Sequence, residues 1–268
     1  MVESLKELNK IVQKPHYRET GNWMVRRILR DAALPCTWLL LHTGVTAHQV
    51  TLAALLTGIL GNVVLGFSGS GAFLTGALLL QLWYYLDHVD SQIARYRKTA
   101  SLTGRFFDFL MHAVVHGLLY FFLGLHAYKT TGKLVFLFWG ALTAFSMLTF
   151  NMIHDLKSKA FIEKLAKASS IRRRPPEGES SAAGVSEPSR AARLFSHAHK
   201  LCEIHVTMNL LTLAACLELL TRGTVDFRLF AAAGYGLLVP AITVIKIVHM
   251  IRTRKFDHEF ESLFHTED

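Results

Sequence analysis

Long, mostly apolar segments alternate with short polar ones along this chain, from about residue 46 onward. A helix that crosses a bilayer needs about 20 consecutive, mostly apolar residues. Six segments are long enough: 46–67, 71–92, 106–127, 132–153, 203–221 and 228–250. They predict an all-α integral membrane protein with six transmembrane helices. Thr46 is expected to cap the first helix, because its hydroxyl can accept a hydrogen bond from an otherwise unpaired N–H group.

Ahead of the first segment, apolar residues recur at helical spacing among lysines and arginines. They are Leu5, Leu8, Ile11 and Val12 in one stretch and Trp23, Val25, Ile28 and Leu29 in the next. This pattern suits amphipathic helices that lie in the head-group plane of a membrane, although a soluble amphipathic helix would show it too. We therefore expect N-terminal interfacial helices.

The domain organisation follows from these segments. Six helices in one compact unit make a single membrane domain, which is expected to span residues 1–254. Within it, residues 169–189 are rich in Ser, Pro, Glu and Arg, and we expect a flexible cytoplasmic loop there. Residues 255–268 mix phenylalanine with acidic residues and are expected to form a peripheral C-terminal tail.

Charge indicates which side of the membrane each end occupies. Hydrophobic residues make up 51% of the chain, yet it carries 29 lysines and arginines and a net charge of +9. On one side, the connections contain only four basic residues: Lys129, Lys133, Arg222 and Arg228. Basic residues collect on the cytoplasmic side, so both termini are expected there, with a bacterial inner membrane as the setting. The positive charge indicates anionic lipid head groups as partners, and no nucleic-acid-binding surface is visible.

Four ionisable residues stand at helical spacing where two of the predicted helices approach the cytoplasm: Asp87, Asp90, Asp108 and His112. Spacings of three and four residues place side chains on one face of a helix. Crowded carboxylates repel one another unless a cation lies between them, and a hard divalent ion prefers oxygen ligands. The pattern predicts a metal site. Salt bridges from Arg95, Arg97 or Arg105 are the structural alternative.

These residues belong to the string Asp87-x2-Asp90-Ser91-x2-Ala94-Arg95-x8-Gly104-x3-Asp108-x3-His112. The string resembles the signature of the CDP-alcohol phosphotransferase family, Asp-x2-Asp-Gly-x2-Ala-Arg-x8-Gly-x3-Asp-x3-Asp. Six of the eight fixed positions match, while Ser91 replaces a glycine and His112 replaces the fourth aspartate. A weaker resemblance covers residues 45–51, where Ala47 and His48 replace the Pro and Asn of a Thr-Pro-Asn-x-x-Thr-like pattern.

The resemblance implies a reaction. A CDP-alcohol donor binds through its pyrophosphate to Mg²⁺ or Mn²⁺, with two ions expected. The hydroxyl of an acceptor, either a lipid or a small alcohol, attacks the phosphorus distal to cytidine, and CMP leaves. The product belongs to phospholipid or related membrane-lipid synthesis. The motif does not show whether donor or acceptor carries the lipid, and a homodimer is implied by the resemblance alone.

The resemblance also assigns roles to single residues. Asp87, Asp90 and Asp108 correspond to metal ligands. Ala94 and Gly104 correspond to places where the nucleotide comes close, and Arg95 to a phosphate contact or a clamp on the carboxylates. Ser91 stands where glycine permits a close backbone approach, so its hydroxyl either contacts the ribose or weakens the nucleotide site. Lys246, near the cytoplasmic end of the last segment, is a candidate substrate-binding residue or a snorkelling lysine.

His112 stands where the family has the aspartate that is thought to act as general base. Histidine suits that role, because its unperturbed pKa of about 6.5 lies near working pH. Its imidazole could instead ligate the metal and shift the preference toward Mn²⁺ or Zn²⁺. A third interpretation is a packing histidine paired with His116, one helical turn away.

Two other functions are compatible with the sequence. An ion-binding transporter also places acidic residues among membrane helices, but such a protein needs polar residues through the whole membrane depth, and here they gather near one face. A catalytically inactive relative that serves as a membrane binding partner would explain the changes at Ser91 and His112. Metal-dependent release of CMP would distinguish the enzyme from both.

Overall fold

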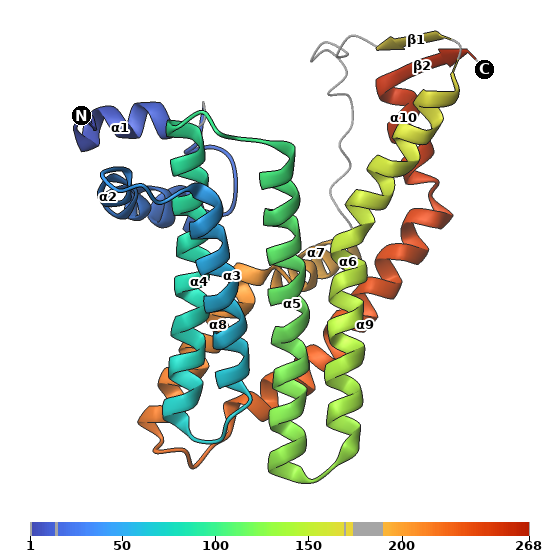
Figure 1. Ribbon diagram of the computed structural model, residues 1–268. Coiled ribbons are helices and arrows are strands. Elements are labelled where there is room, and N and C mark those ends of the chain that lie inside the picture. Colours follow the sequence, from blue (N-terminus) through green and yellow to red (C-terminus); the bar gives the residue numbers. More distant parts are fainter. Residues whose placement is uncertain (1, 14–15, 169, 174–189, 268) are drawn as a thin grey trace.

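The computed structural model describes residues 2–13, 16–168, 170–173 and 190–267. Within these residues the chain is almost entirely helical (Figure 1), which confirms the predicted all-α class. Its elements in chain order are α1 (Leu5–Val12), the π-helix η1 (Val25–Leu29), α2 (Arg30–Leu41), α3 (Ala47–Leu65), α4 (Ser70–Tyr96), α5 (Leu102–Thr131), α6 (Leu134–Lys167), β1 (Ser170–Arg173), α7 (Arg190–Leu201), α8 (Ile204–Leu220), α9 (Phe227–Arg252), α10 (Lys255–Leu263) and β2 (Phe264–Glu267).

The long helices form a bundle with two ends (Figure 1). The motif end carries the α4–α5 connection at residues 97–101, and the first and last helices of the chain also lie toward this end. The opposite end carries the connections at residues 66–69, 132–133 and 221–226. Along the bundle, α3 packs against α4, α5 against α6, and α6 against α9. The motif residues 87–112, at the end of α4 and the start of α5, therefore lie at one end of a helical bundle.

Several helices are suited to a membrane. In the described part of the chain, α3, α5, α9 and most of α6 are long and apolar enough to span one, and α7 with α8 forms a pair bent by 66° that could make a fifth span. The predicted number of six spans is therefore not confirmed. Among the predicted spans, α4 is not apolar enough. It has 27 residues, but Gln81, Trp83, Tyr84 and Tyr85 lower its mean hydropathy.

Exposed side chains support an integral membrane protein. On α3, Leu52, Leu56 and Leu60 follow one another at four-residue spacing and are 47%, 58% and 52% exposed. A continuous apolar stripe of this kind is unfavourable in water and marks contact with lipid or with another protein. Because similar exposed apolar residues occur on all four span-length helices, lipid is the surrounding that explains them together.

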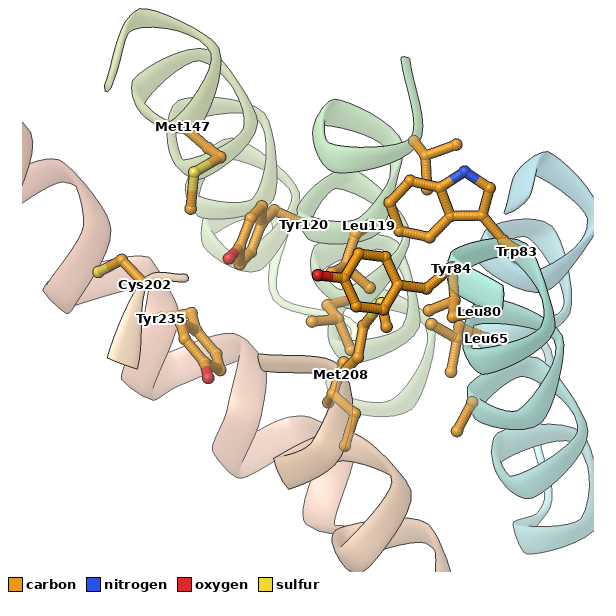
Figure 2. Packing of buried hydrophobic residues seen from close by; sticks show 14 of the residues in the cluster. Leu65, Leu80, Trp83, Tyr84, Leu119, Tyr120, Met147, Cys202, Met208 and Tyr235 are labelled. Carbon is orange, nitrogen blue, oxygen red and sulfur yellow. The ribbon is translucent and has the colours of Figure 1, made fainter. Parts of the chain in front are cut away.

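The main core lies where α4, α5 and α8 meet α9 (Figure 2). Trp83, Tyr120 and Met208 are each at most 2% exposed there. The buried Tyr120 hydroxyl lies 3.3 Å from the hydroxyl of Thr207, which gives both polar groups a partner. Large aromatic side chains thus hold the second half of the bundle against α4 and α5; the Tyr120 hydroxyl has a partner, whereas the buried Nε1 of Trp83 has none among the described residues.

A close backbone contact joins α5 to α6. A Cβ atom added to Gly124 would lie only 2.5 Å from the Cα of Gly140. No side chain fits in that space, so the two helices touch through their backbones, as small residues allow in membrane bundles. This contact fixes how α5 is set against α6.

The N-terminal helices pack onto the motif end of α4. Leu8 and Val12 of α1 are fully buried in a second apolar cluster that includes Val89 and Ile93. By contrast, Leu5 is 46% exposed, so the predicted apolar face of this helix is shared between the protein and its surroundings. The N-terminal segment is therefore part of the framework around the acidic string.

The start of α3 is formed as predicted. The Thr46 hydroxyl accepts a hydrogen bond from the N–H of Gln49, and the Gln49 side chain accepts one from the N–H of Thr46 at 2.8 Å. This reciprocal pair satisfies two N–H groups that a helix start otherwise leaves unpaired.

A cluster of four ionisable side chains, named here the opposite-end cluster, ties the opposite end together. Arg228 pairs with Glu218 at 3.0 Å, and His126 pairs with Asp226 at 2.8 Å. Arg228 also donates to the carbonyl oxygen of Phe67, 2.6 Å away. Burial raises the pKa of Asp226, but hydrogen bonds from His126 and a backbone N–H outweigh it and hold that pKa below its usual range. Polar residues therefore do not gather at one face alone, which corrects the sequence-based interpretation.

The C-terminal segment lies on the extended end of α6. Phe260 of α10 is 3% exposed and meets the ring of Phe161 at a centroid distance of 5.1 Å. Nearby, Lys157 pairs with Glu259 at 2.7 Å, and β2 forms an antiparallel pair with β1. Four residues of the predicted loop 169–189 thus form β1, and the rest of that loop lies outside the described residues.

Candidate active site

Three helix ends meet at the motif end of the bundle. The α4–α5 connection is tied to the α2–α3 connection by Arg97, which donates to the carbonyl oxygens of Val45 at 2.6 Å and Thr43 at 2.8 Å. Ser101 then caps α5 by accepting a hydrogen bond from the N–H of Gly104 at 3.0 Å. These bonds bring the start of α3, the end of α4 and the start of α5 to one place.

Three of the four predicted ionisable residues converge. Each of Asp87, Asp108 and His112 offers a ligand atom, and these atoms all lie within 4.8 Å of one another. The His112 Nδ1 is 3.4 Å from Asp108 Oδ1, and its Nε2 is 3.9 Å from Asp87 Oδ2. We name this group the acidic cluster. It brings together residues from both halves of the string, as the spacing predicted.

Asp90 is held apart from the acidic cluster. Its side chain is turned toward α3, where its Oδ2 accepts a hydrogen bond of 2.6 Å from the hydroxyl of Thr51. Asp90 is only 7% exposed, yet it lines the same cavity as Asp108. The structure therefore separates Asp90 from the other carboxylates by giving it a partner of its own.

The orientation of His112 determines which of its nitrogens is available. Its Nδ1 lies 3.1 Å from the backbone carbonyl oxygen of Asp108. A carbonyl can only accept, so the contact favours the tautomer with hydrogen on Nδ1. The Nε2 lone pair then faces the acidic cluster, where it can accept a proton or bind a cation.

The donor set of the acidic cluster fits a divalent cation. Two carboxylates that approach within the same few ångströms repel each other, and a cation between them removes that repulsion. Carboxylate oxygens suit Mg²⁺ and Mn²⁺, and a nitrogen ligand is better tolerated by Mn²⁺. Asp87, Asp108 and His112 could therefore hold one ion, while Asp90 stands in the wall of the cavity that it shares with Asp108.

A cavity of about 500 Å³, named the larger cavity, opens beside these carboxylates. Its walls include Ala94 and Gly104, the small residues of the string. A Cβ atom on Gly104 would lie 3.2 Å from Nε2 of His48, so a side chain there would crowd the wall. Pockets of roughly 300–1,000 Å³ are usual for small ligands, and this one has room for a nucleotide.

The remaining predicted substrate-binding residues fall in different places. Ser91 and Arg95 both line the larger cavity, and Arg95 also donates to the carbonyl oxygen of Val12 in α1. Lys246 does not line it. The Lys246 side chain instead points its Nζ at the ring of Phe150, 3.7 Å from the centroid. The structure does not bring Lys246 to the larger cavity.

Other residues reach the larger cavity without having been assigned a role from sequence. His48, Thr51 and Arg105 line it together with the string. His48 and Thr51 belong to residues 45–51, whose weaker resemblance to the family pattern was visible in the sequence. The resemblance at residues 45–51 could therefore have indicated that the start of α3 forms a second wall of the cavity, opposite the residues of the motif.

Residues 44–171 match the family model described as CDP-alcohol phosphatidyltransferase. This range contains α3, α4, α5 and α6, and with them the whole string and the His48 segment. No curated protein matches the chain.

Proposed function

Given the CDP-alcohol phosphatidyltransferase domain that this chain carries over residues 44–171, we propose that the protein is a metal-dependent transferase in membrane-lipid synthesis. It would move a phospho-alcohol group from a CDP-alcohol to the hydroxyl of an acceptor and release CMP. The observation that carries the proposal is the convergence of Asp87, Asp108 and His112 beside a cavity of nucleotide size.

The larger cavity would hold the nucleotide half of the donor. Ala94 and Gly104 leave space for it, and Arg95, which lines this cavity and a neighbouring smaller one, has enough N–H donors to contact a donor phosphate oxygen and a second ligand as well. Thr51 holds Asp90 in place at the same wall, so this carboxylate keeps its orientation when the ligand enters. Charge neutralisation and positioning do most of the work in phosphoryl transfer, and these residues supply both.

The chemical step exchanges one P–O bond for another. The acceptor oxygen forms a bond to the phosphorus distal to cytidine, while the bond from that phosphorus to the bridging oxygen of CMP breaks. The proton of the acceptor hydroxyl passes to Nε2 of His112. Asp108 and Asp87 lie 3.4 and 3.9 Å from the imidazole and stabilise its positive charge.

Divalent ions held by the acidic cluster and Asp90, Mg²⁺ or Mn²⁺ and two in number, would withdraw charge from the phosphate oxygens and from the departing CMP. His112 as a ligand for such an ion is the second candidate role. The same Nε2 lone pair would serve, and the 4.8 Å grouping with both carboxylates favours it.

The orientation and assembly of the protein are part of the proposal. The distribution of basic residues supports a motif end that faces the cytoplasm of a bacterial inner membrane. The family resemblance supports a homodimer. Lys98 and Lys133 are exposed residues at the motif end and the opposite end, and they provide matched reporter positions. In a background without native cysteines, an impermeant thiol reagent applied to intact cells should label Lys133→Cys and not Lys98→Cys.

The direct test is CMP release by the purified full-length protein in lipid nanodiscs. CDP-alcohols would be supplied with candidate acceptors, with Mg²⁺ or Mn²⁺ present and again after addition of EDTA. Metal-dependent CMP release that requires both substrates is expected. An inactive relative or an ion transporter would release no CMP with any pair, and release that EDTA leaves unchanged would contradict the metal-dependent mechanism.

A further inference from the structure

A second, smaller cavity of about 120 Å³ lies next to the acidic cluster. Gln13 and Arg30 line it from the N-terminal segment, and Asp87, Ser91 and Arg95 line it from α4. Gln13 and Arg30 precede residue 44 and so lie outside the range that the family model covers. The walls are mostly polar, and this part of the chain had no function assigned to it.

Two arginines face this smaller cavity without a carboxylate partner. In the described part of the chain, neither Arg30 nor Arg95 forms an ion pair. Each is anchored to backbone instead: Arg30 donates through Nη1 to the carbonyl oxygens of Tyr17 and Thr20, and Arg95 through Nε to that of Val12. A guanidinium has five N–H donors, so both arginines keep donors to spare.

Arg30 and Arg95 line one cavity of about 120 Å³, so their like charges repel each other. Like charges held together by the fold cost free energy unless an ion of opposite sign lies between them. Arginine binds phosphate through two parallel N–H···O bonds, so two arginines can engage several phosphate oxygens at once. The negative charge of Asp87 disfavours an anion in this cavity. The two arginines carry more positive charge than Asp87 carries negative charge, and a cation bound to the acidic cluster would neutralise Asp87.

The position of the smaller cavity separates it from the nucleotide. Ser91 and Arg95 line both cavities, whereas Asp90 and Gly104 line only the larger one and Asp87 only the smaller one. The two cavities therefore meet at the end of α4, with the carboxylates between them. At about 120 Å³ against 500 Å³, the smaller cavity has room for a phosphate group and not for a nucleoside.

We propose that the smaller cavity binds a phosphate group, held between Arg30 and Arg95, on a molecule other than the nucleotide donor. Resting on the proposed function, this makes the second substrate or a bound lipid head group a phosphate ester that reaches the carboxylates from the side of the N-terminal helices. The neighbouring Gln13 amide and Ser91 hydroxyl provide further hydrogen-bonding groups.

Binding of inorganic phosphate to the full-length protein tests the site without any turnover. Thermal unfolding would be followed in detergent with EDTA present, as phosphate replaces chloride at constant ionic strength. Phosphate should raise the unfolding temperature of the wild type. Arg30→Gln should weaken the apparent phosphate affinity about tenfold or more, as expected for a lost charge-assisted hydrogen bond. Arg27→Gln, which removes an exposed arginine of η1, should leave that affinity unchanged.

A second pair of variants covers the case in which Arg30→Gln unfolds the segment that Arg30 anchors. Gln13→Glu adds a negative charge to the cavity wall, while Gln13→Met removes the same amide and adds no charge. Phosphate should lose its effect in Gln13→Glu and keep most of it in Gln13→Met. Equal responses in these two variants, or an equal response of Arg30→Gln and the wild type, would overturn the proposal.

Two further arms identify the source of the phosphate. Saturating CMP with Mg²⁺ should leave the phosphate effect in place, and its loss would assign the phosphate to the nucleotide site and overturn the proposal. In the transfer assay, Arg30→Gln should raise KM for a phosphorylated acceptor more than for its unphosphorylated analogue if the acceptor carries the phosphate. If a lipid head group carries it, the variant should instead lose the dependence of activity on phosphatidylglycerol in the nanodisc. A failed transfer assay leaves the binding result standing.

Discussion

Both ends of this bundle bury charged side chains, but they treat the charges differently. At the opposite end, Arg228 and Glu218 are 2% and 3% exposed and neutralise each other at 3.0 Å, and His126 has Asp226. At the motif end, the carboxylates of Asp87 and Asp108 approach each other within the acidic cluster, and Arg30 and Arg95 both line the smaller cavity. At the opposite end each of these carboxylates has a basic partner of its own, whereas at the motif end Asp87 and Asp108 share the imidazole of His112.

The difference separates structural charges from functional ones. The buried pair of Arg228 and Glu218 ties the connection at residues 66–69 to the ends of α8 and α9, and its opposite charges neutralise each other without a ligand. Charges of one sign that the fold holds side by side lower their free energy when an ion of the opposite sign binds. The charges of the motif end therefore support the proposed cation and phosphate sites. The opposite end argues against an ion-transport path, because the buried Arg228 and Glu218 already neutralise each other.

The largest expected effect is on catalysis at the acidic cluster. Asp108→Asn should lower turnover at least about a thousandfold, since bound metal supplies several kcal/mol of transition-state stabilisation. Its unfolding temperature without metal should stay the same or rise, because one repelling charge is gone. CMP release and thermal unfolding measure the two effects. Asp155→Asn changes an exposed aspartate of α6 and should alter neither, while wild-type turnover in Asp108→Asn would refute the site.

His112 comes next. His112→Ala should lose roughly 10²–10⁴ in turnover, the usual contribution of general acid–base catalysis, and keep its affinity for Mn²⁺. Wild-type activity should fall as the pH drops through the titration of the imidazole, and His112→Asp should recover part of the activity with a shifted pH optimum. Binding of Mn²⁺, followed by electron paramagnetic resonance, separates the roles. Lost Mn²⁺ binding would identify a ligand, and unchanged turnover would leave only a packing role.

The opposite end should respond in stability and not in chemistry. Arg228→Met leaves Glu218 buried without its charged partner, with only the N–H of Phe227 as a hydrogen-bond donor, and should cost about 3–5 kcal/mol. The double variant Arg228→Met, Glu218→Met should recover much of this loss, because neither charge remains. Unfolding in detergent gives the stability, and CMP release per folded molecule should stay near the wild-type value in both. A double variant as unstable as the single one would show that Arg228 acts through the carbonyls it bonds.

The smallest effect is expected at the start of α3. Thr46→Ala removes the cap and should cost about 1 kcal/mol, whereas Thr46→Ser keeps the hydroxyl and should cost much less. Thermal unfolding of the two variants, measured side by side, gives the difference. Equal stability would mean that the Gln49 half of the reciprocal pair holds the helix start by itself.

The sequence predicted the parts of the site that depend on local spacing. Asp108 and His112 share a face of α5 because they are four residues apart, and Thr46 caps α3 because a threonine preceding a helix can do so. The same spacing argument placed Asp90 with Asp87, but Asp90 turns to Thr51 on α3, a contact between helices that spacing does not encode. Arg30 could not be placed in this way. It reaches α4 through contacts such as the 2.8 Å bond from Gln92 to its carbonyl, 62 residues away, and no short pattern encodes that distance.

Arg228 shows a second limit. Counting basic residues in connections gave a prediction of orientation, and it treated Arg228 as an exposed loop charge. The structure buries its side chain at the start of α9, over the ring of Phe73, with Glu218 as its partner. A charge count does not include the neutralising partner, so it cannot distinguish a residue that faces water from one that holds two connections together.

The contact between Gly124 and Gly140 limits how this protein can change over generations. Gly124 lies twelve positions beyond His112 on α5, about 18 Å along the helix at ~1.5 Å per residue. A lineage could replace many exposed leucines on these helices at little cost. A methyl group at either glycine would force α5 and α6 apart, since the added Cβ would lie within 2.8 Å of the other backbone. We therefore expect neither glycine to be replaced by itself. A larger residue at either position requires α5, the helix that carries Asp108 and His112, to move away from α6.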